Sequence, residues 1–313
     1  MTFRQLDRDG MIAAYVHVWN AEYPEAPKAE PDVRGYFTFL QEDAFEQGWA
    51  AEVDGKLVGL VPAVEYEHGT AHNRVEADLL LDPAHEPLFE SLIAQFETVA
   101  SGVDCHQRCV WTHDRTDSRL RLLEAYGYSL AQTVPASLLD IEAFDAEPFH
   151  ERLRQVESEL RFTSIREFED RGEDWAPALY ELTWAIAQDI PSPHPPHRIS
   201  LEQFRAMVAN HATHPPETMF VALEGDRMVG YSRVTPSLVR ADLAFTGMSG
   251  TLRSHRRRGV VTALKVYGIE AMRRQGIRWV FTDNDETNPM YQINLRLGFR
   301  PVWRWVQYVK VTS

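Results

Sequence analysis

The chain has 313 residues, of which 44% are hydrophobic and 25% charged, and its formal net charge is −14. This length predicts two domains of about 150 residues each, and the composition is typical of a globular protein with buried cores. No stretch approaches the ~20 consecutive apolar residues of a membrane span, and the N-terminus has no apolar signal segment, so we expect a cytoplasmic protein without a membrane partner.

Charge is divided unevenly between the two halves. Residues 1–150 hold 10 Lys and Arg against 27 Asp and Glu, a net charge of −17, whereas residues 151–313 carry +3. The second half suits an anionic cofactor, while the acidic first half could attract a cationic amine or only aid solubility. The two cysteines, Cys105 and Cys109, lack histidines at metal-binding spacing, so no metal site is predicted.

The hydrophobic pattern of the first half predicts an alternation of strands and helices. In chain order these are a strand at 3–6, helices at 9–20 and 32–45, strands at 48–53, 56–66 and 74–81, a helix at 86–100, a strand at 107–112, a helix at 117–126 and a strand at 128–139. A charged amphipathic segment at 146–160 is predicted to be a linking helix between a domain at 1–145 and one at 161–313.

The second half predicts the same order of elements. They are a strand at 162–168, helices at 174–188 and 200–210, strands at 218–223, 228–234 and 242–252, a helix at 260–275, a strand at 278–282, a helix at 290–297 and a strand at 302–311. Ser200 and Gln203 have the spacing of a capping box at the start of the second helix.

An internal repeat relates the two halves. Turn sequences around Gly59 and Gly230 resemble each other, as do those around Gly127 and Gly298, and both pairs are 171 residues apart. Two matches at one offset indicate a duplicated domain.

The segment from His255 to Val261 carries the clearest chemical signal. It follows a predicted strand, contains Arg256, Arg257 and Arg258, and ends at Gly259 where a helix opens. The first N–H groups of a helix lack intrahelical partners and lie at the positive end of its dipole, so this turn predicts a phosphate site. Nucleic-acid binding is an alternative for a basic run, but the acidic total charge disfavours it.

This turn, with Asn288-Pro289-Met290 and Leu297-Gly298-Phe299 after it, resembles the GNAT (GCN5-related N-acetyltransferase) superfamily. The family turn reads Arg or Gln, two residues, Gly, one residue, then Gly or Ala; Arg256 and Gly259 match it, whereas Val261 departs from it.

The resemblance implies an α/β (α+β) fold of two tandem GNAT-like domains, each a mixed central sheet flanked by helices with a splayed pair of parallel strands. It further implies acetyl-CoA as co-substrate, with pantetheine between the strands at 242–252 and 278–282. The implied cofactor-binding residues are Ser249, Gly250, Thr251, Arg256, Arg257, Arg258, Gly259, Val260, Val261, Thr262, Asn284 and Asn288.

The offset tests whether the first half repeats this site. Positions 256–259 correspond to His85, Glu86, Pro87 and Leu88. Glu86 would repel phosphate and Pro87 has no donor N–H, so the first half is predicted to be a degenerate GNAT-like domain without a cofactor turn.

The implied reaction is direct transfer of an acetyl (acyl) group to the amine of a small molecule or peptide. The family's usual acid is a tyrosine at the position of Asn294, and Tyr291 lies one helical turn earlier, so both are candidate catalytic residues. Asp242 is the acidic residue nearest the family's base position, although it could be a strand-edge charge.

Substrate signals are few. Asp189 opens a proline-rich loop at 189–197, where this family builds its acceptor site, and could hold an amine. The alternative to an enzyme is a non-catalytic acyl-CoA-binding regulatory or scaffold module, which the missing strand carboxylate and the substituted tyrosine favour. The acceptor and the oligomeric state do not follow from the sequence.

Overall fold

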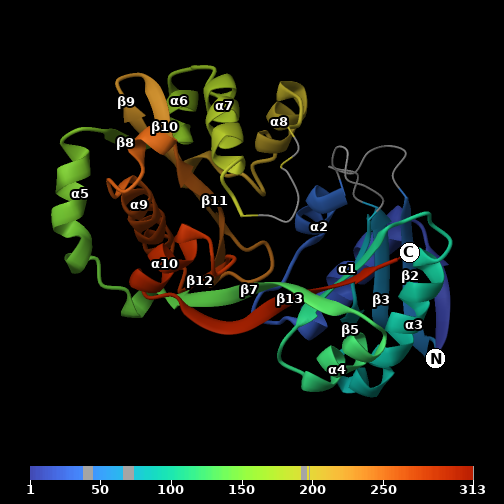
Figure 1. The fold of residues 1–313 in the computed structure, drawn as a ribbon. Helices are drawn as coiled ribbons and strands as arrows, with labels where there is room; N and C mark the ends of the chain where they lie inside the picture. Colours follow the sequence, from blue (N-terminus) through green and yellow to red (C-terminus); the bar gives the residue numbers. More distant parts are fainter. Residues whose placement is uncertain (38–44, 66–73, 192–195, 197, 313) are drawn as a thin grey trace. The chain divides into compact units, whose positions relative to one another are not determined.

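The structure is a computed structural model that describes residues 1–37, 45–65, 74–191, 196 and 198–312. The chain forms two compact units: unit 1 comprises Met1–Ala136 and Trp303–Ser313, and unit 2 comprises Ser137–Val302. Both combine a mixed sheet with helices, as the sequence predicts (Figure 1). No helix within the described ranges is long and apolar enough to cross a membrane.

Unit 1 contains the elements of the first half and the last strand of the chain. Its elements are β1 (Thr2–Leu6), α1 (Arg8–Glu22), α2 (Glu30–Phe37), β2 (Glu46–Val53), β3 (Lys56–Glu65), β4 (Arg74–Asp78), β5 (Leu80–Leu81), η1 (Pro83–Leu88), α3 (Phe89–Ala100), β6 (Gln107–His113), α4 (Asp117–Ala125) and most of β7 (Ser129–Asp140). Of the helix predicted at 32–45, residues 32–37 are helical, residues 38–44 lie outside the described residues, and residue 45 is not helical. Pro87 explains why 83–88 forms a 3₁₀ segment before the regular helix α3 begins.

The sheet of unit 1 has the strand order β1-β2-β3-β4-β6-β13. Its last strand is β13 (Arg300–Val311), whose residues Trp305–Val311 pair antiparallel with β6. The neighbours are antiparallel except β4 and β6, which run parallel. Residues 305–311, which the sequence pattern assigned to the second domain, therefore complete the first sheet.

Unit 2 contains the elements that surround the predicted turn. After η2 (Ile141–Ala143) and η3 (Glu147–Phe149), it comprises α5 (His150–Glu157), β8 (Arg161–Ser164), α6 (Ile165–Asp170), α7 (Ala176–Ala187), α8 (Leu201–Val208), η4 (Pro216–Thr218), β9 (Met219–Glu224), β10 (Arg227–Pro236), β11 (Leu243–Thr251), η5 (Arg253–His255), α9 (Val260–Arg274), β12 (Trp279–Asp283) and α10 (Pro289–Arg296). The predicted linking helix thus corresponds to η3 and α5, within unit 2.

The strand predicted at 162–168 is wrong in its second part. Only Arg161–Ser164 is extended, and Ile165–Asp170 is helical. Ile165 and Phe168 are both buried and are three residues apart, a spacing that puts them on one face of a helix. The capping box of Ser200 and Gln203 is confirmed, with both reciprocal hydrogen bonds present.

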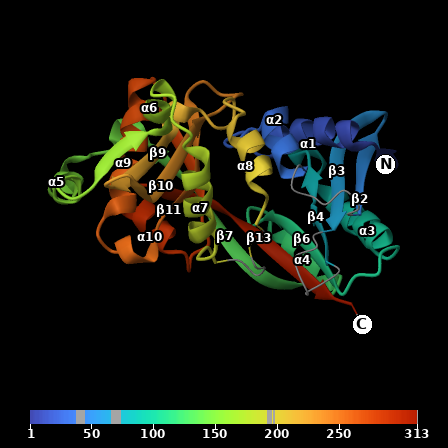
Figure 2. The same cartoon turned by 90° about the horizontal axis from the view of Figure 1, so that it is seen from above.

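Helices α7 and α9 cover opposite faces of the sheet in unit 2, as the two views show (Figure 1, Figure 2). Adjacent residues of β10 demonstrate this arrangement. A Cβ on Gly230 would contact Val260 and Leu264 of α9, whereas the neighbouring Tyr231 packs in the cluster that α7 and α8 form. The turn before α9 therefore follows the end of β11, in a sheet that has hydrophobic core packed against both faces.

Candidate functional site

The N-terminus of α9 has no cap from a side chain. Its N-cap residue Gly259 has a φ of +89°, and Arg257, two residues earlier, has a φ of +63°. No side-chain acceptor bonds the first N–H groups of the helix. Donors that have no partner at the positive end of a helix dipole are suited to an anion.

The three arginines of the turn have different surroundings. Arg256 pairs with Asp189 and Arg258 with Glu159, while the exposed Arg257 has no ion pair within the described part of the chain. His255 is buried, and its Nε2 lies 3.3 Å from the carboxylate of Glu224 at the end of β9. The histidine thus fixes the turn to the sheet while the arginines stay at the surface.

Arg152 of α5 is a further cation at this turn, which sequence reasoning missed. Its Nη2 donates to the carbonyl oxygen of Arg257 at 2.9 Å. A Cβ on Gly259 would lie 2.7 Å from Arg152 Nε, so any larger residue here would displace the Arg152 side chain. The contact joins residues 105 positions apart, and no local pattern in the sequence indicates it.

The carboxylate of Asp189, predicted to hold an acceptor amine, pairs with the arginines that precede α9. Both its oxygens accept from Arg253 Nε, at 3.0 and 3.1 Å, and Oδ1 also accepts from Arg253 Nη2 at 2.6 Å. Oδ2 accepts from Arg256. Hydrogen bonding from Arg253 first, and then the charge of Arg256, hold the pKa of Asp189 below its ordinary value. Of the loop that follows, 192–195 and 197 lie outside the described residues.

The parallel strands β11 and β12 part after a short pairing. Leu243, Ala244 and Phe245 pair with residues 279–281, and the Thr246 and Thr282 hydroxyls join at 2.5 Å. Beyond that point β11 continues to Thr251 and pairs only with β10 on its other side. The splayed pair that the family resemblance implied is therefore present in unit 2.

The parting leaves backbone groups of β11 without a neighbouring strand. Leu252 N–H donates to the Val229 carbonyl oxygen at 2.9 Å, so Gly250, two residues earlier, also directs its peptide groups to β10. Ser249 and Thr251 alternate with Gly250 and Leu252 along the strand, so their peptide N–H and C=O groups point to the opposite side, where β12 no longer pairs. Gly250 has a packing role, because a Cβ there would lie 2.5 Å from Ile186 of α7.

A β-bulge lies where the strands part. Ser232 pairs with Ser249 but Val234 pairs with Thr246, so the single residue Arg233 of β10 stands opposite two residues of β11. A bulge bends its strand and increases the local twist. It therefore provides a physical cause for the divergence of β11 from β12.

The candidate base Asp242 lies at the opposite end of β11 from the turn. It precedes the first residue of the strand, and its carboxylate pairs with Arg240 at 3.0 Å. Hydrogen bonding from Arg240 lowers the pKa of Asp242. The structure does not bring this carboxylate together with the arginine turn.

The buried Asn294 pairs with the half-buried Asn284 beside the end of β12. Asn294 Nδ2 donates to Asn284 Oδ1 at 2.6 Å, and Asn294 Oδ1 is buried without a hydrogen-bond partner. Tyr291 is half-buried one helical turn earlier on α10. Asn288 instead caps α10, since its side chain accepts from Met290 N–H at 2.9 Å.

The remaining predicted cofactor residues lie on the first turn of α9. Val260 and Val261 are buried and Thr262 is half-buried. Val261 occupies the position at which the family has Gly or Ala, and the helix accommodates its side chain without interruption.

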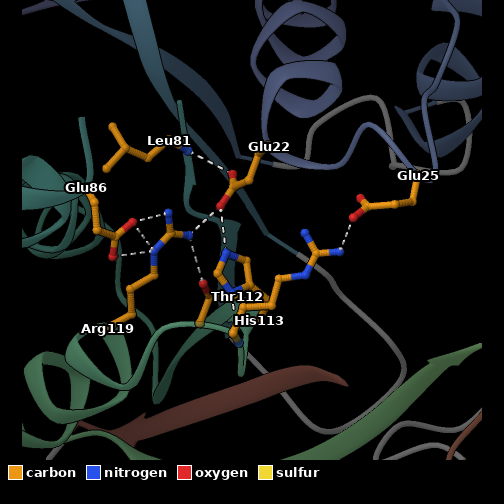
Figure 3. A network of polar contacts seen from close by, with 8 residues as sticks. Glu22, Glu25, Leu81, Glu86, Thr112, His113 and Arg119 are labelled. Carbon is orange, nitrogen blue, oxygen red and sulfur yellow. Dashed lines mark hydrogen bonds and ion pairs between the residues drawn. The ribbon is translucent and has the colours of Figure 1, made fainter. Parts of the chain in front are cut away.

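The corresponding turn of unit 1 is filled by an internal ion pair (Figure 3). Glu86 accepts from Nε and Nη2 of the buried Arg119, whose Nη1 bonds Glu22. Asp82 caps the 3₁₀ segment η1, which contains Glu86, by accepting from Ala84 N–H at 2.9 Å. A carboxylate therefore stands where unit 2 has arginine.

The parallel strands of unit 1 are paired over a longer stretch than those of unit 2. β4 pairs with β6 over its whole length from Arg74 to Asp78, and Leu79 N–H continues to the Trp111 carbonyl oxygen at 3.2 Å. By the 171-residue offset, this stretch corresponds to the part of β11 that separates from β12. Unit 1 therefore keeps these parallel strands paired over a longer stretch than unit 2 does.

Comparisons with known proteins agree with this geometry. Residues 176–299 match the Acetyltransferase (GNAT) family. No curated protein matches the chain. Among solved structures, the chain is similar to a tandem GNAT protein from the clavulanic acid biosynthesis pathway, with 19% identity, a TM-score of 0.71 and coverage of 100% of this chain and 98% of the other.

Two further structures have the same overall fold. A GCN5-related N-acetyltransferase from Sphaerobacter thermophilus is 17% identical, with a TM-score of 0.66 and coverage of 99% of this chain and 95% of the other. A GNAT-family acetyltransferase from Colwellia psychrerythraea is 10% identical, with a TM-score of 0.62 and coverage of 99% of both chains. Residues 176–299 therefore match the GNAT acetyltransferase family, and the chain as a whole has the fold of a tandem GNAT protein.

Proposed function

We propose that this protein is an acetyl-CoA-dependent N-acetyltransferase that transfers an acetyl (acyl) group directly to an amine of a small molecule or peptide, using unit 2. One observation carries the proposal: strand β11 parts from β12 and leads directly into the uncapped, arginine-rich start of α9. An open strand edge followed by an anion site suits a long ligand with amides in its middle and phosphates at one end.

In this proposal the residues of unit 2 hold acetyl-CoA at two places. Arg256, Arg257 and Arg258, with the free N–H groups from Gly259 to Thr262, bind the pyrophosphate. The outward peptide groups of Ser249 and Thr251 bind the pantetheine amides. From Thr251 back to Gly247 the strand spans roughly 13 Å, so the thioester end belongs near the bulge.

Acetyl-CoA supplies an activated acyl group in its thioester. The acceptor nitrogen forms a bond to the acyl carbon, the bond from that carbon to sulfur breaks, and the proton lost by the amine passes to solvent or a base. Tyr291 is proposed as the acid that protonates the departing sulfur, and the Asn284–Asn294 pair as the group that positions the cofactor arm. Asp242, at the far end of β11, would act as base only through water.

The proposal is tested by following CoA thiol release with acetyl-CoA and a panel of amines. Amine-dependent release is expected, together with loss of acetyl-CoA binding in an Arg256→Gln/Arg257→Gln variant. Arg240→Gln, which removes an arginine outside the turn, serves as the control. Acetyl-CoA binding without turnover of any acceptor would favour the alternative, a non-catalytic acyl-CoA-binding module, which Asn294 at the tyrosine position favours.

Tyr291 can be tested separately. In a Tyr291→Phe variant the proposal expects kcat to fall by at least tenfold while the Kd for acetyl-CoA stays within twofold. Unchanged turnover would remove Tyr291 as the acid.

A further inference from the structure

Arg233 lies at the bulge of β11, on the sheet face that α7 and α8 cover. Its neighbours across β9 and along β10, Met219 and Tyr231, both belong to the hydrophobic cluster of those helices. Its side chain is half-buried. An arginine therefore projects on the helix α7 side of the sheet, at the point where β11 and β12 part.

Gly247 allows the guanidinium to lie against the strand backbone. A Cβ on this glycine would be 2.4 Å from Arg233 Nε, 2.8 Å from Nη2 and 3.0 Å from Cζ. Any other residue at 247 would displace the guanidinium. The glycine and the arginine thus form one structural feature, in direct contact at the bulge.

No anion neutralises Arg233 within the described ranges. Nη1 makes one long contact with the Thr213 carbonyl oxygen, at 3.4 Å, and Nε is buried without a hydrogen-bond partner. Arg240 and Arg253 of the same unit differ from Arg233, since each pairs with an aspartate.

A titratable group that senses Arg233, His214, does not supply the missing charge. Burial, and then the charge of Arg233, lower the pKa of His214 to about 3, so this histidine is neutral at physiological pH. Its Nδ1 lies 3.1 Å from the Thr213 hydroxyl, which holds the ring in place. The surroundings of Arg233 are therefore polar but without negative charge.

A partly buried guanidinium without a counter-ion is unfavourable, because the lost hydration is not replaced. We propose that Arg233 is a specificity-determining residue which binds a carboxylate of the acceptor, so that the substrate is an amine that also carries a carboxylate, as in an amino acid. This inference rests on the proposed function, which puts the thioester end near the bulge. The planar fork of arginine matches a carboxylate through two parallel hydrogen bonds.

The position of Arg233 limits the size of the acceptor. Its guanidinium contacts Gly247, so a carboxylate bound there keeps an amine one to three carbons away close to the parting of the strands. Small amino acids meet this requirement, whereas polyamines have no group for Arg233. Because the chain is acidic overall, its net charge does not attract a carboxylate. Recognition of an acceptor that carries a carboxylate therefore depends on a local cation.

The test uses the full chain, acetyl-CoA, and amino acids each matched with its carboxamide. Wild-type protein is expected to acetylate acids with a kcat/KM at least tenfold above that of the carboxamides. Arg233→Gln should raise KM for the acids at least tenfold and change values for carboxamides by less than twofold. Gly247→Ala should reproduce this acid-specific loss, whereas Arg205→Gln, which removes an arginine from an exposed pair with Asp174, should not.

Two results separate this inference from the proposed function. Equal use of acids and carboxamides, or an equal loss for both in Arg233→Gln, would overturn the role of Arg233 and leave the acetyltransferase intact. If nothing is acetylated, calorimetric titration of the same acids into CoA-saturated protein decides: binding that Arg233→Gln abolishes supports the anion site, and its absence overturns it.

Discussion

The guanidinium of Arg253 donates hydrogen bonds from Nε and Nη2 to the carboxylate of Asp189, at 3.0 and 2.6 Å. The same carboxylate also pairs with Arg256, a residue of the proposed phosphate site. The carboxylate of Asp189 thus pairs with Arg256, an arginine that a bound phosphate would otherwise pair with. A bound pyrophosphate and Asp189 would compete for Arg256.

Asp189→Asn is therefore expected to tighten acetyl-CoA binding. The two arginines are 75% and 42% exposed, and exposed ion pairs contribute about 0–1 kcal/mol, which corresponds to a Kd lowered up to about fivefold. Isothermal titration with acetyl-CoA measures the change.

The matched control is Asp174→Asn, which removes a similar exposed pair with Arg205 away from the turn. Weaker acetyl-CoA binding in Asp189→Asn would show that Asp189 orders the turn rather than competing for it. A raised KM for the amine at constant Kd would instead support the role in holding the acceptor that the sequence suggested.

Gly259→Ala should disable the turn before α9. The residue has a φ of +89°, and an added Cβ would lie 2.7 Å from Arg152 Nε. The left-handed conformation costs a non-glycine residue about 1–2 kcal/mol. We expect the Kd for acetyl-CoA to rise at least tenfold, because both the turn and Arg152 must shift.

Gly276→Ala is the control, at the other end of the same helix. Gly276 also has a positive φ, of +75°, but a Cβ there would meet no atom within 4 Å. Its substitution should lower stability to a similar degree, measured by urea unfolding, and leave acetyl-CoA binding unchanged. If both variants bind equally well, the turn is not the cofactor site.

Local patterns predicted much of this fold. The helix from Val260, the hairpin of β9 and β10, and the positive-φ turns at Gly127 and Gly298 all depend on neighbouring residues. Part of the 171-residue repeat could be recognised for the same reason, since Gly127 and Gly298 both have a positive φ, a conformation to which glycine is well suited.

The missed residues depend on contacts that the sequence does not encode locally. Arg152 reaches the turn from 105 positions away, and the role of Arg233 depends on a one-residue bulge in the opposite strand. Likewise, β13 completes the sheet of unit 1, a pairing that alternation of residues does not specify. The helix at 165–170 was missed because it contains only two apolar residues, Ile165 and Phe168, too few to establish a helical period next to the preceding strand.

Lys265→Met should stabilise the protein at neutral pH. Lys265 is 6% exposed on α9, and burial lowers its pKa to about 8. Holding this group charged below that pKa opposes folding. A shift from 10.5 to about 8 corresponds to about 3 kcal/mol as an upper bound, so we expect a gain of about 2–3 kcal/mol at pH 7.

The gain should depend on pH in one direction. Between about pH 8 and 10.5 the unfolded chain binds the proton of Lys265 more tightly than the folded one, so wild-type stability rises with pH in this window. The advantage of Lys265→Met should therefore shrink above pH 8 and disappear near 10.5. Urea unfolding at pH 7, 9 and 10.5 measures this, and Lys56→Met, at an exposed position, is the control. A constant difference across this range would mean that packing, not charge, causes the effect.

One acetyl-CoA per chain is the expected stoichiometry. In unit 1 the Glu86 carboxylate and the buried Arg119 occupy the position of the phosphate turn, and β4 stays paired with β6. Isothermal titration should give one site, and the Arg256→Gln/Arg257→Gln variant should give none. Residual binding of one equivalent in that variant would assign a site to unit 1.

Arg119→Met separates the two units further. The substitution leaves Glu22 and Glu86 without their arginine partner, so unit 1 should lose about 3–5 kcal/mol of stability, while acetyl-CoA binding in unit 2 keeps its Kd.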